Sequence, residues 1–415
     1  MLNAVLDYLF YYPLVMATVW MIGASLYRWR IERLDPPLDR PPKLDSTPPV
    51  SVIVPCFNEQ DNAEETLLAA MALDLPEFEV IAVNDGSADG TAAILDSLAA
   101  RHSRLRVVHL ARNQGKALAL QAGALLARYE ILLCIDGDAV LDRHSARWML
   151  RHFVADPKMA AVTGNPRIRN RSTLLGRVQI GEFSSMVGMI KRAQQNFGPI
   201  FTVSGVISAF RRSALHEVGY WSPNMLTEDI DISWKLQRAG WRVVFEPHAL
   251  VWILTPETVK GLWKQRLRWA MGGAQVFFGN RGVMLHRDQS QLWPLYLEMF
   301  ASLVWSYLLA ATGVLWLLGM IFPDLAVPGV ASPVLPQWSG AILGSVCMLQ
   351  FAVGAWLDRR YDSGLGRNYY WMIWYPIVFW IIHFAATVVA YPKVIARGRG
   401  RRARWVSPDR GLRSL

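Results

Sequence analysis

The stretch "FEVIAVNDGSADGT", residues 78–91, decides how this chain folds. A short apolar run with the character of a buried strand ends in a turn rich in Gly and Asp, and a helix follows. The same alternation recurs on both sides of it. We predict strands at 50–57, 105–110 and 131–138, and helices at 59–73 and 115–129. Strands that alternate with helices predict a parallel sheet covered by helices on both faces.

Polar side chains gather where these predicted strands end. They are Asn58 and Glu59, then Asn84 and Asp85, then Asp136 and Asp138. In sheets of this kind, ligands bind at the carboxyl ends of the strands. The acids at two strand ends are therefore expected to converge on one crevice.

The composition is too apolar for an ordinary soluble enzyme. Hydrophobic residues make up 53% of the 415 residues, charged residues 18%, and there are 18 tryptophans. The net charge of +10 suits anionic lipid, nucleic acid or an anionic substrate. No nucleic-acid-binding motif accompanies it, so we expect no nucleic-acid partner. The three cysteines form no CxxC pair, which indicates neither a zinc site nor a disulfide framework.

Four uncharged stretches are long enough to cross a bilayer. One lies at 8–27, within an N-terminal segment 1–34, and a Pro-rich linker follows at 35–49. The others lie at 299–322, 338–357 and 369–392, within a membrane region 291–392. The arginines that follow the first stretch place that end in the cytoplasm.

The basic tail, residues 393–415, conflicts with this count of spans. If all four stretches cross and the soluble domain is cytoplasmic, the tail ends outside, whereas its seven arginines favour the inside. The alternative is that Pro376 breaks the last stretch into a re-entrant or interfacial piece.

Three motifs carry candidate chemistry, each beside a plainer interpretation. In "CIDGD" (134–138) two carboxylates suit Mg²⁺ or Mn²⁺, although Asp and Gly are equally common in turns. In "NQGKA" (113–117) a glycine and Lys116 open a helix that can hold an anionic nucleotide. In "LTEDIDISWKL" (226–236) Glu228 and Asp231 suit a helix start, and Asp229 suits a general base.

A fourth motif, "WKQRLRWAMGG" (263–273), mixes basic and aromatic residues. It has the character of a helix on a lipid surface, with Lys264 and Arg266 suited to headgroups. The alternative is that Gln265, Arg268 and Trp269 face a substrate. We expect interfacial amphipathic helices across 256–290.

Together these motifs resemble those of processive, membrane-embedded family 2 glycosyltransferases, which include cellulose, chitin and hyaluronan synthases. The order "VPCFNE", "VNDGSADGT", "CIDGD", "TEDIDISWKL" and "QRLRW" is theirs, and the last matches their Q-x-x-R-W motif. Longer phrases, among them "FTVSGVISAFRRSAL", "KGLWKQRLRWA" and "RARWVSPDRG", resemble the bacterial poly-β-1,6-N-acetylglucosamine synthases. Those synthases usually have two N-terminal membrane segments, and this sequence shows only one.

The resemblance implies a cytoplasmic GT-A (Rossmann-like) catalytic domain at 50–255, inserted between transmembrane helices of the bacterial inner membrane. It implies that Asp85 contacts the nucleoside, with Asn113 and Lys116 nearby and Glu228 among the substrate-binding residues. Asp138, with Asp136, would hold Mg²⁺ or Mn²⁺ on the diphosphate. Asp229 would be the base, and Gln265, Arg268 and Trp269 would flank the acceptor and the diphosphate.

The activity implied is inverting, processive transfer from UDP-GlcNAc into β-1,6-linked poly-N-acetylglucosamine, coupled to export for a biofilm matrix. The implied partners are the growing glycan, the lipid bilayer and a small membrane subunit with cyclic di-GMP-dependent activation. Three alternatives remain open on the sequence alone. They are synthesis of chitin, hyaluronan or cellulose, transfer of one sugar to a lipid acceptor, and a transporter or inactive scaffold.

Overall fold

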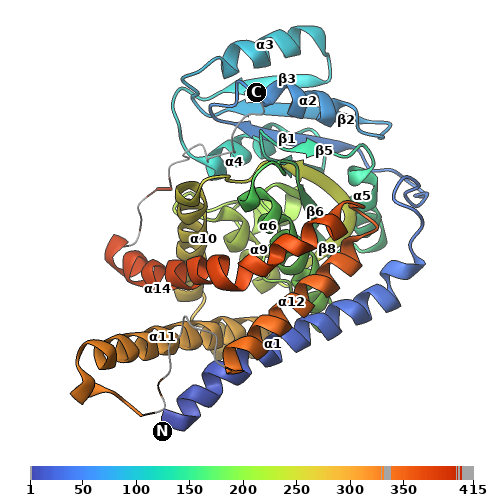
Figure 1. The fold of residues 1–415 in the computed structure, drawn as a ribbon. Helices are drawn as coiled ribbons and strands as arrows, with labels where there is room; N and C mark the ends of the chain where they lie inside the picture. Colours follow the sequence, from blue (N-terminus) through green and yellow to red (C-terminus); the bar gives the residue numbers. More distant parts are fainter. Residues whose placement is uncertain (1, 329, 331–337, 399, 401, 404–415) are drawn as a thin grey trace.

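The catalytic half is built on one eight-stranded sheet with the order β3-β2-β1-β4-β7-β6-β8-β5 (Figure 1). The computed structural model describes residues 2–328, 330, 338–398, 400 and 402–403. The strands are β1 (Val50–Cys56), β2 (Phe78–Asn84), β3 (Leu105–His109), β4 (Ile131–Ile135), β5 (Val140–Leu141), β6 (Met159–Ile168), β7 (Ile207–Arg211) and β8 (Arg242–Ile253).

The first half of this sheet is parallel, as predicted, and the sheet as a whole is mixed. β1 pairs in parallel with β2 and β4, and β2 pairs in parallel with β3. The expectation of a wholly parallel sheet is wrong at β7, which runs antiparallel to both β4 and β6, and at β5, which runs antiparallel to β8. The direction of β7 has a local cause. The reason is a tight turn at the carboxyl edge, where the N–H of Ile207 donates to the carbonyl of Ser204 at 3.2 Å. Because β7 starts at that edge, it must run the other way.

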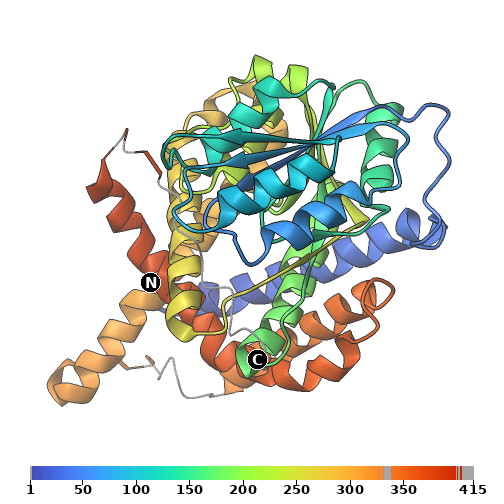
Figure 2. The same ribbon diagram turned by 90° about the horizontal axis from the view of Figure 1, so that it is seen from above.

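Helices cover both faces of the sheet (Figure 2). Alternate residues of β1 show why: Val52 and Val54 pack into the core on one face, and Ile53 packs into the core on the other. The first face carries α2 (Ala63–Met71), α3 (Thr91–Arg101) and α5 (Ser145–Ala155). The second carries α4 (Lys116–Leu126), α8 (Arg212–Glu217) and α9 (Glu228–Arg238).

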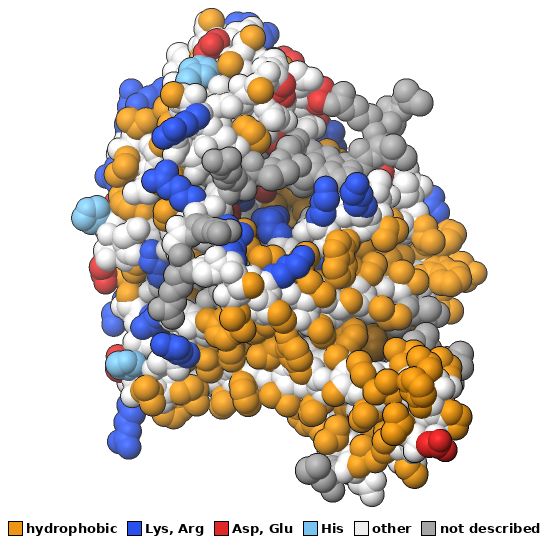
Figure 3. All heavy atoms as spheres, turned by 90° about the vertical axis from the view of Figure 1, so that its left-hand side faces the viewer, with side chains coloured by type: hydrophobic (Ala, Val, Ile, Leu, Met, Phe, Trp, Pro, Cys, Tyr) orange, Lys and Arg blue, Asp and Glu red, His pale blue; other side chains and the backbone are white. Residues whose placement is uncertain are grey.

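Among the described residues, three helices are long and apolar enough to cross a membrane, and they overlap the predicted spans 8–27, 299–322 and 338–357. They include α1 (Leu2–Arg30), α11 (Trp293–Ile321) and α12 (Trp338–Asp358), which lie below the sheet in Figure 1. Figure 3 shows apolar side chains covering this lower part of one face, with Lys and Arg side chains above them. An apolar belt beneath a basic fringe is typical of a membrane surface.

The stretch 369–392 differs from the single span that we expected. It is broken into a 3₁₀ turn (Tyr369–Trp374), a π-helical turn (Tyr375–Phe379) and the start of α14 (Trp380–Arg397). Pro376, which has no N–H to donate, lies in the π-helical turn. The interrupted alternative is therefore the one that the structure favours.

The end of the described chain lies beside the catalytic domain. The N–H of Ala403 donates to the carbonyl of Pro223 at 2.9 Å, and Arg402 Nη1 donates to Gln114 Oε1 at 3.1 Å. The basic tail thus starts on the same side as the sheet domain. The rest of the tail, 404–415, lies outside the described residues.

A buried ionic cluster joins α1 and α12 to the sheet domain. Arg192, in α7 (Lys191–Phe197), pairs with Glu32 at 2.7 Å and with Asp358 at 2.9 Å, and all three side chains are fully buried. Arg167 of β6 pairs with the same Asp358 at 2.8 Å. Glu32 follows α1 and Asp358 ends α12, so two of the candidate membrane helices are tied to the sheet domain through Arg192.

Candidate active site

The carboxyl edge of the sheet brings the predicted acids together at the loop after β4. Asp136 and Asp138 are half-buried there, on either side of Gly137. A Cβ at Gly137 would lie 2.9 Å from the carbonyl oxygen of Pro55, which is closer than real contacts allow. The glycine therefore lets this loop lie against β1 and fixes the two carboxylates at the edge.

Lys116 is the centre of the charged cluster. Its Nζ lies 2.6 Å from Asp136 Oδ1 and 3.1 Å from Glu228 Oε1, and it donates to the carbonyl of Gly205 at 3.1 Å. Burial lowers the pKa of Lys116, but the two carboxylates outweigh it and raise the pKa above its usual value. The lysine stays charged and ties α4 to α9.

Asp229 lies beside this cluster, in the first turn of α9. Its Oδ2 accepts from the N–H of Gly205 at 3.2 Å, and its Oδ1 accepts from the N–H of Ile230 at 2.9 Å. Burial and the negative charge of Glu228 raise the pKa of Asp229 to about 6, against the opposing charges of Lys116 and Arg268. A carboxylate with this pKa is suited to accept a proton near neutral pH.

Asp85 holds a second loop at the same edge. The N–H groups of Gln114 and Gly115 donate to its carboxylate at 2.7 and 2.9 Å. Asn113 Oδ1 accepts from the same N–H of Gly115 at 3.0 Å. Burial raises the pKa of Asp85 although these N–H groups oppose it. Gly115 has a φ of 93°, which a side chain would resist, so the loop that precedes Lys116 depends on this glycine.

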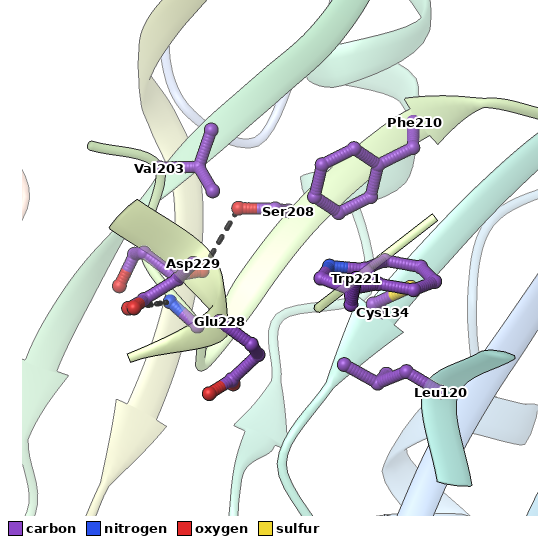
Figure 4. A pocket seen from close by; sticks show the side chains of 10 residues that line it. Leu120, Cys134, Val203, Ser208, Phe210, Trp221, Glu228 and Asp229 are labelled. Carbon is purple, nitrogen blue, oxygen red and sulfur yellow. Dashed lines mark hydrogen bonds between the residues drawn. The ribbon is translucent and has the colours of Figure 1, made fainter. Parts of the chain in front are cut away.

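A small recess opens beside Asp229, with free space of about one water molecule. Figure 4 shows its apolar side, formed by Phe210, Trp221, Cys134 and Leu120, facing Glu228 and Asp229. These four side chains belong to the buried core on this face of the sheet.

Helix α10 (Val259–Gly279) contains the Q-x-x-R-W residues and brings Arg268 near Asp229. Arg268 is exposed, donates to the carbonyl of Leu226 at 3.4 Å and acts electrostatically on Asp229. Gln265 Oε1 is buried with no hydrogen-bond partner among the described residues. Trp269 packs, half-buried, against the main core. α10 touches α9 closely, because a Cβ at Gly272 would lie 1.9 Å from Thr227 Oγ1.

Residues 48–272 match the model of the "Glycosyltransferase like family 2" family, which is more than half of the chain. The chain belongs to glycosyltransferase family 2. This transferase is 37% identical to a poly-beta-1,6-N-acetyl-D-glucosamine synthase of Staphylococcus epidermidis and 38% identical to one of Staphylococcus aureus. Each match covers 98% of both chains.

The fold of the transferase also occurs in a solved structure. A mannosyltransferase from Pyrobaculum calidifontis in complex with GDP-Man and Mn²⁺ is 22% identical, with a TM-score of 0.55. The match covers 93% of this chain and 99% of that one, and at this identity it shows the fold alone. The predicted GT-A fold and the resemblance to family 2, whose members invert the anomeric centre, are thus confirmed.

GT-A transferases typically use a divalent metal, and the carboxylates of this transferase fit one in part. Asp136 and Asp138 are hard oxygen donors at one loop, suited to Mg²⁺ or Mn²⁺. No group of three or more His, Cys, Asp or Glu in the described residues could hold an ion. Substrate oxygens would therefore have to complete the shell.

The expectation that Arg266 faces lipid headgroups is wrong. Its side chain is 1% exposed and pairs with Glu182 at 2.6 Å. Lys264, two residues earlier, is exposed as expected. The basic and aromatic character of this stretch suited headgroups, but it gave no sign of an acid 84 residues earlier in the chain. The central position of Lys116 between Asp136 and Glu228 was likewise missed.

Proposed function

We propose that this transferase polymerises N-acetylglucosamine from UDP-GlcNAc into β-1,6-linked poly-N-acetylglucosamine. The observation that carries the proposal is the meeting of a base, Asp229, with the Lys116 cluster and the Q-x-x-R-W helix at one sheet edge. The near-complete match to the staphylococcal synthases supports this donor and this linkage.

The reaction is a single displacement. Asp229 takes the proton of the acceptor's C6 hydroxyl, and that oxygen attacks the anomeric carbon of the donor. The bond to the diphosphate breaks on the opposite face, so an α-linked donor gives a β-linked product and UDP leaves. Arg268 stabilises the charge that grows on the diphosphate, since its guanidinium is a cation beside Asp229. Lys116 holds the carboxylates of Asp136 and Glu228 in place through its two ion pairs.

A divalent ion held by Asp138 and Asp136 would supply further charge neutralisation at the diphosphate. Asp85, with Asn113 beside it, is proposed to contact the nucleoside. Gln265 and Trp269 are proposed to contact the acceptor end of the glycan.

We also propose a multi-pass protein of the bacterial inner membrane with its catalytic domain in the cytoplasm. α12 ends at the catalytic domain through Asp358, and the tail begins there through Ala403. Both features put the end of α12 and the start of the tail on the same side as the catalytic domain, as expected for three membrane spans. Export of the glycan, the small partner subunit and its activation by cyclic di-GMP stay predictions. Transfer of product into sealed vesicles tests the first, and dinucleotide binding with and without the subunit tests the others.

The purified, detergent-solubilised protein should be incubated with labelled UDP-GlcNAc and Mg²⁺, followed by sizing and linkage analysis. We expect a long polymer that a β-1,6-specific hexosaminidase digests. One sugar per lipid would instead indicate the non-processive alternative, and resistance to the enzyme would indicate another polymer. Absence of UDP release would leave the transporter or scaffold alternative.

A further inference from the structure

An ion pair lies buried directly beside the proposed acceptor residues, and the catalytic scheme does not use it. Glu182 ends α6 (Leu174–Glu182), and its Oε2 lies 2.6 Å from Arg266 Nη2 of α10. The two side chains are 3% and 1% exposed. Burial raises the pKa of Glu182, but Arg266 and His383 more than offset this, so the carboxyl stays ionised. Burying two charges is costly, and stability alone is a weak reason to keep them.

The side of the Arg266 guanidinium that is not paired with Glu182 contacts Trp269, the residue proposed to contact the acceptor. The Arg266 guanidinium lies 4.3 Å from the centre of the Trp269 ring, one helical turn further along α10. Its Nε and Nη1 have no hydrogen-bond acceptor among the described residues. The cation therefore interacts with the carboxylate on one side and with the indole face on the other.

Glu182 is itself held from a third element. His383 of α14 lies 2.5 Å from its second oxygen, Oε1, and Tyr375 also hydrogen-bonds to it. The neighbouring Gly181 is packed so closely that a Cβ there would lie 2.0 Å from Met372 Sδ. The Glu182 carboxylate is thus held between α6, α10 and the helical segments that run from Tyr369 to Arg397.

We propose that Glu182 and Arg266 are positioning residues that hold the Trp269 ring at the glycan. This rests on the proposed function, in which Trp269 contacts the acceptor. A ring that stays in one orientation stacks on successive sugars without being reordered after each addition, so the polymer dissociates less often. The pair should therefore control product length, and it should leave the use of the donor almost unchanged.

The test compares three variants in the full-length detergent-solubilised protein. Glu182→Gln and Arg266→Lys each weaken the pair. Because either could fail to fold, the double variant Glu182→Leu with Arg266→Met removes both charges together, an exchange that buried ion pairs often tolerate. The control is Lys264→Met, an exposed basic residue of the same helix. The measurements are the thermal midpoint, the KM for UDP-GlcNAc and the mean product length.

We expect the folded variants to make polymer about three- to tenfold shorter, the range that loss of one cation–π contact gives, with the donor KM unchanged. Normal-length polymer from the folded double variant would overturn the proposal, because the pair would then only stabilise the fold. Trp269→Phe tests the proposed role of Trp269 separately from the positioning role of Glu182 and Arg266. If it leaves product length unchanged, the proposed role of Trp269 fails. If it shortens the product and the pair variants do not, the positioning role fails.

Discussion

Asp229 differs from Asp85 in the like charge beside it. Two backbone N–H groups hold the carboxylate, and Glu228 next to it adds a like charge. These surroundings raise the pKa of Asp229 to about 6, so its protonation changes within a pH range in which activity can be measured. Lys116, by contrast, is paired on two sides and stays charged throughout that range.

The first prediction concerns pH. The base must be ionised, and its pKa is raised to about 6, so activity is present above this pH and is lost as pH falls through it. We expect kcat/KM to fall about tenfold per pH unit on this acidic limb. Glu228→Gln removes a like charge and should move the limb to lower pH. A limb that stays in place in this variant would argue against the coupling.

The second prediction concerns the two central acids. Asp229→Asn and Asp138→Asn should each reduce incorporation of labelled N-acetylglucosamine by at least about 10²-fold, while the protein still inserts in membranes. Asp96→Asn, an exposed acid of α3, is the control and should keep full activity. Near-normal incorporation by Asp229→Asn would contradict the role of this residue as the base, and the same result for Asp138→Asn would contradict its role at the diphosphate.

At this scale the sequence identifies residue types better than their partners. Asp85, Asp136, Asp138 and Asp229 follow from strand ends and a helix start, and the structure places them on one edge. Arg266 was misassigned because a basic side chain in an aromatic stretch suits lipid headgroups, and the stretch itself does not show what packs against it. The acid that pairs with Arg266 lies on another helix, and no local pattern connects the two.

At the scale of elements, the contact of α10 with α9 sets the geometry of the site. The Cβ that Gly272 lacks would fall on Thr227, the residue before Glu228 and Asp229. α10 can therefore approach the base closely only where it has no side chain. Arg268 of the Q-x-x-R-W motif can therefore lie near Asp229.

The third prediction follows from that contact. Gly272→Ala should push α10 away from α9 and lower activity by about tenfold or more, since small displacements of catalytic groups are costly. Gly273→Ala is a matched control, because nothing lies within 4 Å of its added Cβ. Polymer synthesis measures the activity of both variants, and their melting temperatures should be equal. Equal activity would then show that the contact between α10 and α9 does not set the activity.

The elements themselves were only partly predictable. The parallel strands β1 to β4 follow from alternating strand and helix patterns. The antiparallel β7 does not, because its direction depends on a turn at Ser204–Ile207 that has no distinctive sequence. The broken helix at 369–392 was one of two predicted alternatives, and hydropathy could not choose between them because it measures composition and not continuity.

At the scale of the whole molecule, the buried cluster around Arg192 joins parts far apart in the chain. The fourth prediction is that Arg192→Met destabilises the protein by about 3–5 kcal/mol, because Glu32 loses its counterion in a dry site and Asp358 loses one of two. Thermal or denaturant unfolding in detergent measures this. The control is Arg101→Met, whose partner Glu64 is exposed, and it should change stability by less than about 1 kcal/mol. Equal effects would indicate that water reaches the cluster.

The same cluster sets an order of events during synthesis. Arg192 leaves the ribosome well before Asp358, by roughly 10 to 30 seconds at ordinary elongation rates. Until then the arginine has Glu32 but not its second carboxylate, which arrives only after α11 and α12 have been made. The ionic cluster around Arg192 therefore cannot be complete before the end of α12 is synthesised. A chain released before Asp358 would leave Arg192 with one of its two carboxylate partners.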